Sequence, residues 1–387
     1  MSYSYVSLFS GAGGLDIGLE RAGLKTVALC EIEKNFCATL ETNKGWKHND
    51  GNTYLKGARI INADVRDVKA SMLFEGKELD VVVGGPPCQA FSSSGKQLSV
   101  LDPRGALVME FCRIIGALKP KMFVFENVRG LVTARDKNGV PGGVITELIN
   151  VLQDLGYSCR ASLLNSADYG AYQRRVRCFI VGSRRGEAPN FPAGKFCKTP
   201  DLLVKPWNSL SDFLKLHEDT DKENHVFPTP NLLEQLKGLP NGSGIKSPGK
   251  AEKTRPNGHW GYRQGTFIAD LTLPSRTVTG SASQDWIRWN RKLRRLTFNE
   301  VKLLQGFPSD WKVLGTKAHQ FKQIGNAVPA VFGEMIGKMI IQYLENYPTT
   351  KPVRLEIPDS FKGYIEYTKR DHERNKSSRG IHKHFEK

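Results

Sequence analysis

The sequence lacks the features that mark a membrane-spanning, secreted or disulfide-stabilised protein. No run of apolar residues approaches the roughly 18 that a membrane span needs. The first residues, MSYSYVSLFSGAGG, do not have the basic and then apolar layout of a signal peptide. The seven cysteines are odd in number and widely spread, with no CxxC pair and no cysteine and histidine cluster at zinc spacing. These absences predict a cytoplasmic protein with no membrane partner, no disulfide framework and no structural metal.

Positive charge is in excess, and the excess is unevenly placed. The 387 residues include 56 Lys and Arg against 39 Asp and Glu, a formal net charge of +17, which favours a polyanionic partner. Residues 1–239 carry a net +4, whereas residues 240–299 carry 11 basic and 3 acidic side chains. In that second block, arginines and aromatic residues are interleaved: Arg255, Trp260, Tyr262, Arg263, Arg276, Trp286, Arg288, Trp289, Arg291, Arg294 and Arg295. Arginine with aromatics suits phosphate and base contacts, so the block predicts a nucleic-acid-binding surface.

The first half of the chain alternates short β-branched runs with stretches of helical periodicity, which is typical of a doubly wound α/β sheet. Two of the runs, VVVGG and MFVFEN, are continuously apolar, as expected for parallel strands covered on both faces. The predicted strands are Tyr3–Phe9, Thr26–Glu31, Arg59–Ile61, Leu79–Val83, Met122–Glu126, Ser158–Leu164 and Arg177–Val181. The predicted helices are Leu15–Ala22, Lys34–Thr42, Gly105–Leu118 and Val144–Leu155. We therefore expect a Rossmann-like, mostly parallel sheet.

The composition changes after Gly182, where segments rich in Pro, Gly and Asn, such as LPNGSGIKSPGK, interrupt the chain every few residues. Helical periodicity returns over Phe298–Leu304 and Ala330–Leu344. We predict that residues 1–186 and 291–347 form one discontinuous α/β domain. Residues 187–290 would then be an inserted, irregular small domain, and residues 348–387 a basic C-terminal tail.

A glycine-rich turn, Phe9-Ser10-Gly11-Ala12-Gly13-Gly14, joins the first strand to a helix. Glycines let the backbone approach a ligand, and the helix start presents free N–H groups. Glu31 ends the next strand at the spacing where an acid can hold ribose hydroxyls. The turn does not match GxGxxG, which favours a smaller nucleoside such as S-adenosyl-L-methionine over a dinucleotide. Asp64, after the third strand, could contact the adenine edge or cap a helix.

Reactive side chains follow two predicted strands. Cys88 comes just after VVVGG, and Pro86-Pro87 restricts the backbone so that the thiol is aimed. Glu126 ends MFVFEN, and a carboxyl group there could protonate or hydrogen-bond a ring nitrogen of a base. A small buried thiol and a helix-capping Glu126-Asn127 pair are the alternatives. Whether the two strand ends are adjacent is not visible in one sequence.

Two further motifs stand later in the chain. In QRRVR, strand alternation places Arg175 and Arg177 on the same face, so both can point into one site, although surface arginines on an edge strand are also possible. QIGNAVP, which contains Asn326 and Ala327, precedes the last predicted helix and by itself indicates only a turn and a helix start.

Together, FSGAGG, Glu31, GGPPCQAFSSSG, ENV, QRRVR, RTVTG and QIGNAVP resemble, in order and spacing, the motifs of the bacterial DNA (cytosine-5-)-methyltransferases over about residues 5–345. The resemblance implies methyl transfer from S-adenosyl-L-methionine to C5 of a flipped-out cytosine in a specific double-stranded DNA sequence. It implies that Cys88 adds to C6 and that Glu126 contacts N3 and the exocyclic amine. Arg177 would orient Glu126 or nearby loops, and Arg175 would bind O2 of the base or a phosphate.

The resemblance also assigns binding residues. Ile32 stands where relatives often place an aromatic residue, so apolar contact with adenine would replace stacking. The implied cofactor-binding residues are Phe9, Gly11, Ala12, Gly13, Gly14, Glu31, Ile32, Asp64, Val65, Pro87, Asn326 and Ala327. The expected DNA contacts are Ser92, Ser94, Lys96, Arg104, Arg263, Arg276 and Thr277. Residues 187–290 would be the target-recognition domain.

Other functions share some of these features. A tRNA cytosine-5 methyltransferase has nearly all the motifs, but the long basic insertion favours DNA. A catalytically silent DNA-binding module is disfavoured because every chemical position is intact. The family usually acts as a monomer, and a cognate restriction endonuclease is a possible partner. No helix-turn-helix or zinc finger offers a template from which to predict the recognition sequence.

Overall fold

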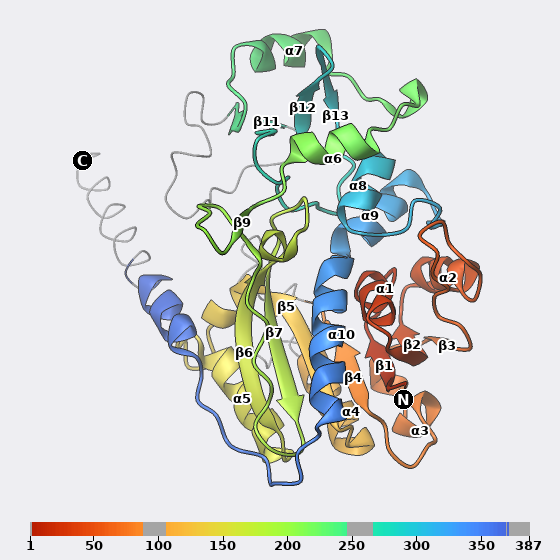
Figure 1. Cartoon of the computed structure of the whole chain (residues 1–387), viewed down its shortest axis with the longest axis vertical. Helices are drawn as coiled ribbons and strands as arrows, with labels where there is room; N and C mark the ends of the chain where they lie inside the picture. Colours follow the sequence, from red (N-terminus) through yellow and green to blue (C-terminus); the bar gives the residue numbers. More distant parts are fainter. Residues whose placement is uncertain (1, 88–105, 246–265, 369, 371–387) are drawn as a thin grey trace, which may run out of the picture.

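The large sheet has the predicted Rossmann-like character (Figure 1). The computed structural model describes residues 2–87, 106–245, 266–368 and 370. Its seven strands are β1 (Ser4–Leu8), β2 (Lys25–Glu31), β3 (Arg59–Asn62), β4 (Val81–Gly84), β5 (Met122–Val128), β6 (Ser158–Asn165) and β7 (Val176–Ser183). They follow the order β3-β2-β1-β4-β5-β7-β6. Only β7 runs antiparallel to its neighbours, so the prediction of a mostly parallel sheet is confirmed.

Helices cover both faces of this sheet. They are α1 (Gly14–Arg21), α2 (Lys34–Asn43), α3 (Ala70–Leu73), α4 (Ala106–Leu118), α5 (Gly143–Asp154) and α10 (Ala330–Glu345). Alternation along β4 divides its side chains between two cores: Val82 packs in the cluster that contains α4 and α5, whereas Val81 and Val83 pack in the cluster that contains α1 and α10. The continuous apolar run VVV is therefore explained by burial on both faces.

The helices α1 and α10 approach one another so closely that their backbones touch at the crossing. A Cβ atom built on Gly18 would lie 2.0 Å from the carbonyl oxygen of Ala330, and one built on Gly333 would lie 2.2 Å from that of Leu15. Two helices approach this closely only when both carry glycine at the crossing. The last long helix thus returns to the first and packs against it.

The rest of the described chain forms smaller elements. A four-stranded sheet has the order β10 (Ser243–Gly244), β11 (Phe267–Ile268), β12 (Trp286–Trp289) and β13 (Lys292–Arg295). The helices of this part are α6 (Leu210–His217) and α7 (Pro230–Lys237), and β8 (Phe196–Cys197) pairs with β9 (Lys205–Pro206). In Figure 1 this small domain lies above the large sheet. The predicted boundary at residue 290 falls in the turn between β12 and β13, so the small sheet continues to Arg295.

The arginines and tryptophans of this sheet correct one sequence-based interpretation. Trp286 is buried, and the guanidinium of Arg295 lies 4.0 Å from its ring centroid. Arg294 is 2% exposed and donates to both carboxylate oxygens of Glu300, at 2.9 and 2.7 Å. Arg288 donates to the backbone carbonyl of Leu239 at 2.7 Å. These residues hold the small domain together, so the prediction that they form a nucleic-acid-binding surface is wrong for Trp286 and Arg294.

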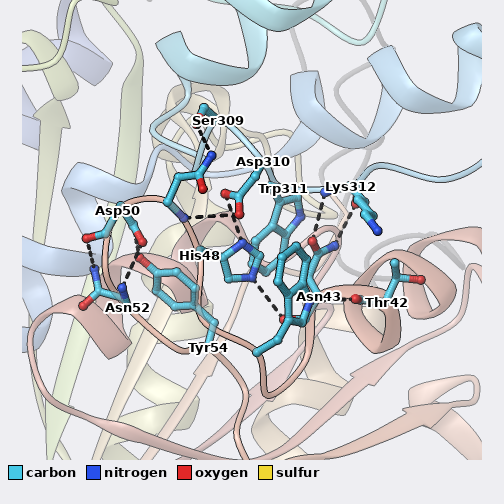
Figure 2. A network of polar contacts seen from close by, with 12 residues as sticks. Thr42, Asn43, His48, Asp50, Asn52, Tyr54, Ser309, Asp310, Trp311 and Lys312 are labelled. Atoms are coloured by element: carbon cyan, nitrogen blue, oxygen red, sulfur yellow. Dashed lines mark hydrogen bonds and ion pairs between the residues drawn. The ribbon is translucent and has the colours of Figure 1, made fainter.

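Helices α8 (Phe298–Leu304) and α9 (Lys317–Asn326) lead back to α10, and the loop between them is tied to the loop after α2 (Figure 2). The ring of His48 stacks on Trp311 with 5.1 Å between centroids, and its Nδ1 lies 3.3 Å from Asp310 Oδ1. Asn43 donates to the carbonyl of Lys312 at 2.7 Å and accepts from its N–H at 2.9 Å. This network holds α9 beside the N-terminal half of the sheet.

The stretch Lys317–Glu345, which comprises α9 and α10, is long and apolar enough, by length and composition, to cross a membrane. However, 61% of its most apolar window is buried inside the protein. The core cluster that buries Phe332, Ile336 and Ile340 accounts for that burial, as expected of the core helix of a folded domain.

The described part of the predicted C-terminal tail packs against the large domain, which corrects the expectation of a tail along that stretch. Residues 359–368 are helical, and Phe361 is fully buried in the core cluster of α4 and α5. The side chain of Gln153 donates to the carbonyl of Leu355 at 2.7 Å. The guanidinium of Arg129 lies 5.5 Å from the ring centroid of Tyr364. Apolar residues within the basic sequence thus add a C-terminal brace, residues 350–368, to the fold.

We predict that Phe361→Ala lowers the free energy of unfolding by about 3–5 kcal/mol, because it removes a fully buried aromatic ring and leaves a cavity. Chemical denaturation followed by circular dichroism measures this. Tyr367→Ala on the same helix is the control, since Tyr367 is 53% exposed and its loss should change stability by less than about 0.5 kcal/mol. Equal stabilities for Phe361→Ala and the wild type would contradict the packing of the brace.

Candidate active site

A cavity of about 470 Å³ opens at the carboxyl ends of β1, β2, β4 and β5, where open α/β sheets bind their ligands. Most of the residues predicted to bind a cofactor line it: Phe9, Gly11, Gly14, Glu31, Ile32, Asp64, Val65, Pro87, Asn326 and Ala327. Two of the predicted residues do not. Ala12 is buried in a core cluster, and Gly13 is the N-cap of α1. Their small size is required by packing and turn geometry.

The glycine-rich turn is hydrogen-bonded to the side chain of Glu31. Gly11 and Gly13 have φ angles of 58° and 86°, in the left-handed region that favours glycine. The N–H of Gly11 donates to Glu31 Oε2 at 2.8 Å, and the N–H of Glu33 donates to Oε1 at 2.9 Å. Burial raises the pKa of Glu31, while these two donors lower it. A carboxylate has about four acceptor positions, so Glu31 can still accept from a ligand's hydroxyl groups.

The opposite wall is formed by the residues after β3. Asp64 caps the short helical turn Val65–Asp67: its Oδ1 accepts from the N–H and the Nε of Arg66, both at 3.0 Å. The hydrogen bond from the Arg66 side chain holds the pKa of Asp64 below its ordinary value. The cap predicted as one of two roles is therefore present, and Asp64 lines the cavity as well. Ile32 is 59% exposed and offers the cavity an apolar surface.

These features fit a nucleoside cofactor. The acceptor side chain of Glu31 suits ribose hydroxyls, Ile32 and Val65 suit the faces of a purine ring, and the start of α1 carries no side-chain cap that would occupy its N–H groups. Cavities of about 300–1,000 Å³ hold ligands of this size.

The far end of the cavity carries a buried carboxyl group. Glu126 lies near the end of β5, which pairs in parallel with β4, and Gly85 follows β4 directly beside it. A Cβ atom on Gly85 would lie 2.7 Å from Glu126 Oε2, so a larger residue there would displace the carboxyl group from this position. The amide of Asn127 donates to the carbonyl of Pro86 at 3.1 Å. The two strand ends, whose adjacency the sequence could not show, are therefore in contact.

Arg177 pairs with this carboxyl group. Its Nε lies 3.0 Å from Glu126 Oε1. Burial raises the pKa of Glu126, and the positive charges of Arg177 and Arg175 lower it in part. The net result is a carboxyl group whose pKa is above its ordinary value. Such a group can hold a proton and donate it to a ligand.

Arg175 joins three of the motifs. Its guanidinium donates to the backbone carbonyl of Val278 in RTVTG at 2.8 Å and to that of Gly325 in QIGNAVP at 2.9 Å. A Cβ atom on Gly325 would lie 2.1 Å from the carbonyl carbon of Thr279, so these two motifs touch through backbone. Arg175 also lines the cavity. The predicted role of Arg175 toward base O2 or a phosphate stays a prediction beside this structural one.

The remaining predicted site residues fall into two groups. Cys88, Ser92, Ser94, Lys96, Arg104 and Arg263 lie outside the described residues. Arg276 is described: its guanidinium lies 4.0 Å from the ring centroid of Phe267, and its Nε lies 3.4 Å from Asp285 Oδ2. The hydroxyl of Thr277 donates to the carbonyl of Arg174 at 2.8 Å. Their DNA contacts remain predictions.

Sequence reasoning missed several residues that line the cavity. Asn127 was considered only as part of a helix cap, Lys322 pairs with Glu33 at 2.8 Å, and Asp16 is buried on α1. The sequence does contain a signal for Asp16, because it is an acid among Leu15, Ile17 and other residues of an otherwise apolar helix face. The sequence contains no such signal for Lys322, because a lysine on a surface helix is ordinary.

A nucleoside-sized cavity that ends at a buried carboxyl group paired with an arginine, at the strand ends of a sheet of this order, is typical of an α/β enzyme with a nucleoside cofactor. Residues 3–342 match the family model for C-5 cytosine-specific DNA methylases, and the chain belongs to that family. It is therefore a DNA cytosine-5 methyltransferase with S-adenosylmethionine as its methyl donor.

Curated relatives agree with this membership. The chain is 31% identical over 355 residues to the Type II methyltransferase M1.HphI of Haemophilus parahaemolyticus, which covers 89% of this chain and 88% of the relative. It is 34% identical over 361 residues to the Type II methyltransferase M.PspPI of a Psychrobacter strain, with 90% and 81% coverage.

Solved structures share the fold. A candidate DNA modification methyltransferase encoded in an E. coli prophage has a TM-score of 0.65 at 22% identity, covering 89% of this chain and all of the other. The Entamoeba histolytica methyltransferase EhMeth has a TM-score of 0.59 at 17% identity, covering 89% and 99%. The α/β methyltransferase fold is thereby confirmed.

We predict that Glu126→Gln becomes more stable relative to the wild type as the pH rises above about 4.5. The folded-state pKa of Glu126 lies above the ordinary value of 4.5, so the folded chain keeps this proton after the unfolded chain has released it. Wild-type stability therefore falls through this group as the pH rises from about 4.5 through the folded-state pKa. Each unit of elevation adds about 1.4 kcal/mol to the difference.

Denaturation of both proteins between pH 5 and pH 8 measures the effect. Glu345→Gln, at an exposed position near the end of α10, is the control, because an exposed carboxylate has no burial cost to relieve. A stability difference between Glu126→Gln and the wild type that stays constant with pH would refute the elevated pKa of Glu126.

Proposed function

We propose that this enzyme methylates C5 of a flipped-out cytosine within a specific double-stranded DNA sequence and that Cys88 adds covalently to C6 of the base. The observation that supports it is the contact between the ends of β4 and β5. That contact places Glu126 against Gly85, two residues before Pro87 and three before Cys88, beside the cofactor cavity.

Covalent addition of the thiolate makes C5 of cytosine reactive enough to be methylated. C5 of cytosine is a poor nucleophile, and addition of a thiolate to C6 makes C5 an enamine-like carbon that can accept a methyl group. S-adenosylmethionine supplies that methyl group when bound. Afterwards a base removes the proton from C5, and elimination breaks the bond between C6 and Cys88, which restores the ring and the thiolate.

Glu126 is suited to assist the addition. The electrons that the thiolate pushes into the ring reach N3, and a carboxyl group that holds a proton can hydrogen-bond or protonate N3 as this happens. Arg177 keeps the carboxyl group oriented through its contact at 3.0 Å and opposes a further rise of its pKa. The low exposure of the site strengthens both interactions.

The base must leave the duplex to reach this cavity, which costs a few kcal/mol of unstacking and unpairing. Basic residues that grip the flanking backbone can offset that cost. We assign this task to the small domain between residues 187 and 295, where the exposed Arg291 and Lys292 stand at the turn of the β12–β13 hairpin. We also propose that the enzyme acts as a monomer in the cytoplasm and that it is the partner of a cognate restriction endonuclease.

We predict that Cys88→Ala abolishes methyl transfer, because it removes the thiol that is proposed to form the bond to C6. Duplex DNA that carries 5-fluorocytosine at the target should form a covalent complex with the wild type, since fluorine cannot be removed as a proton from C5. Denaturing gel electrophoresis detects that complex. Cys197→Ala, at a partly buried cysteine of the small domain, should retain activity and trapping. Methylation by Cys88→Ala would overturn the proposal.

We predict that duplex DNA, and not tRNA, takes up the methyl group when the two compete at equal concentration for labelled S-adenosylmethionine. The reason is the long basic insertion after residue 186, since an RNA-acting relative would need less recognition apparatus. Expression in a methylation-free host followed by bisulfite sequencing then maps the target sequence. Preferential labelling of tRNA would support the RNA-acting alternative instead.

A further inference from the structure

Asp16 is a buried acid at the edge of the cofactor cavity that the proposed chemistry does not use. It is the third residue of α1, is 1% exposed and lines the cavity together with Ser7 and Gly14. Within the described chain, neither of its carboxylate oxygens has a hydrogen-bond partner. The hydroxyls of Ser7 and Tyr5 are close enough to the carboxyl group to lower its pKa, but the Tyr5 hydroxyl donates to the backbone carbonyl of Asp16, at 3.4 Å, and not to the carboxylate.

The other acids that line the cavity all have partners. These are Glu31 with the N–H groups of Gly11 and Glu33, Glu33 with Lys322, Asp64 with Arg66, and Glu126 with Arg177. One turn further along α1, Glu20 accepts from the N–H of Leu55 at 2.7 Å and from the hydroxyl of Thr26 at 2.5 Å. Asp16 alone among these acids faces the cavity without a donor in the described residues.

The charged form of Asp16 would be stabilised by a cation, which the described residues do not supply. Burial raises the pKa of Asp16 to about 7, the Ser7 hydroxyl lowers it and the nearby Glu20 raises it. Burying the charged form without a partner is costly, so the unliganded group is easily protonated at neutral pH. A ligand cation at hydrogen-bond distance would favour the charged form and bind through a charge-assisted hydrogen bond.

S-adenosylmethionine has two cationic centres, the sulfonium and the α-ammonium. The free N–H groups at the start of α1, where Gly13 makes no side-chain cap, suit the carboxylate of its amino-acid end. The ammonium is attached to the same carbon as that carboxylate. Asp16 is in the first turn of this same helix, so the ammonium is the cation that falls within its reach.

We propose that Asp16 binds the α-ammonium group of S-adenosylmethionine and so fixes the amino-acid end of the cofactor at the start of α1. This inference rests on S-adenosylmethionine as the cofactor. The product S-adenosylhomocysteine keeps the ammonium and lacks the sulfonium. Asp16 should therefore contribute equally to the affinity for S-adenosylmethionine and for S-adenosylhomocysteine.

The test is a binding cycle on the full chain without DNA, measured by titration calorimetry. The probes are S-adenosylhomocysteine and 4-(5′-deoxyadenosin-5′-ylthio)butanoate, which differs from it only by lacking the amino group. We expect the wild type to bind the amino compound about 10–100-fold more tightly, as befits one charged hydrogen bond. Asp16→Asn should discriminate between the two by less than about 3-fold. The control Glu20→Gln, on the same helix, should discriminate as the wild type does.

Each outcome has a distinct meaning. Wild-type affinities that are equal for the two compounds overturn the role of Asp16 even if Asp16→Asn does not fold. Undiminished discrimination by a folded Asp16→Asn overturns it as well. A selective loss of affinity for S-adenosylmethionine, with S-adenosylhomocysteine unaffected, would assign Asp16 to the sulfonium and refute the ammonium contact. Failure of the wild type to bind S-adenosylhomocysteine at all would instead refute the cofactor assignment.

Discussion

The backbone contact between α1 and α10 is the constraint on which the site depends. Gly18 and Gly333 allow the two helices to touch without intervening side chains. The same close approach continues at the cavity, where a Cβ atom on Gly14 would lie 2.4 Å from the carbonyl oxygen of Val328. The lining residues from the start of the chain therefore contact those from residues 326–328. Any side chain at the crossing would move these two segments apart, so the glycines of FSGAGG and of α10 serve the same cavity.

Burial, which takes carboxyl groups out of water, raises the pKa of three acids in the site. Glu31, Glu126 and Asp16 all have pKa values above the ordinary range because they are buried, yet their surroundings differ. Glu31 receives two backbone donors, Glu126 faces an arginine, and Asp16 has neither. The same effect, burial, thus suits these three carboxyl groups to the different roles proposed for them, because the groups that surround each one differ.

The elements that local pattern determines could be predicted, and those that depend on long-range contact could not. All seven strands of the large sheet were predicted, since a continuous apolar run such as Val81–Gly84 is distinctive. The contact of Gly85 with Glu126 depends on strand order, which the sequence does not display. Trp286 and Arg294 were misinterpreted because an arginine beside aromatic residues looks the same whether it binds phosphate or, as here, a buried Glu300. The C-terminal brace was missed because the tail was interpreted from the net positive charge of residues 348–387 as a whole, which conceals Ile357, Phe361 and Ile365.

The C-terminal brace packs against the segment that follows the site residue Glu126. The family match ends at residue 342, and the brace lies beyond it. Its helix nevertheless reaches the segment that directly follows Glu126-Asn127-Val128: Tyr364 lies under Arg129, and Phe361 shares a core cluster with Leu131 and Val132. A carboxyl group whose burial is costly keeps its position only if the backbone around it is held firmly. The added segment therefore stabilises the backbone that follows Glu126 through the core cluster that it shares with Leu131 and Val132.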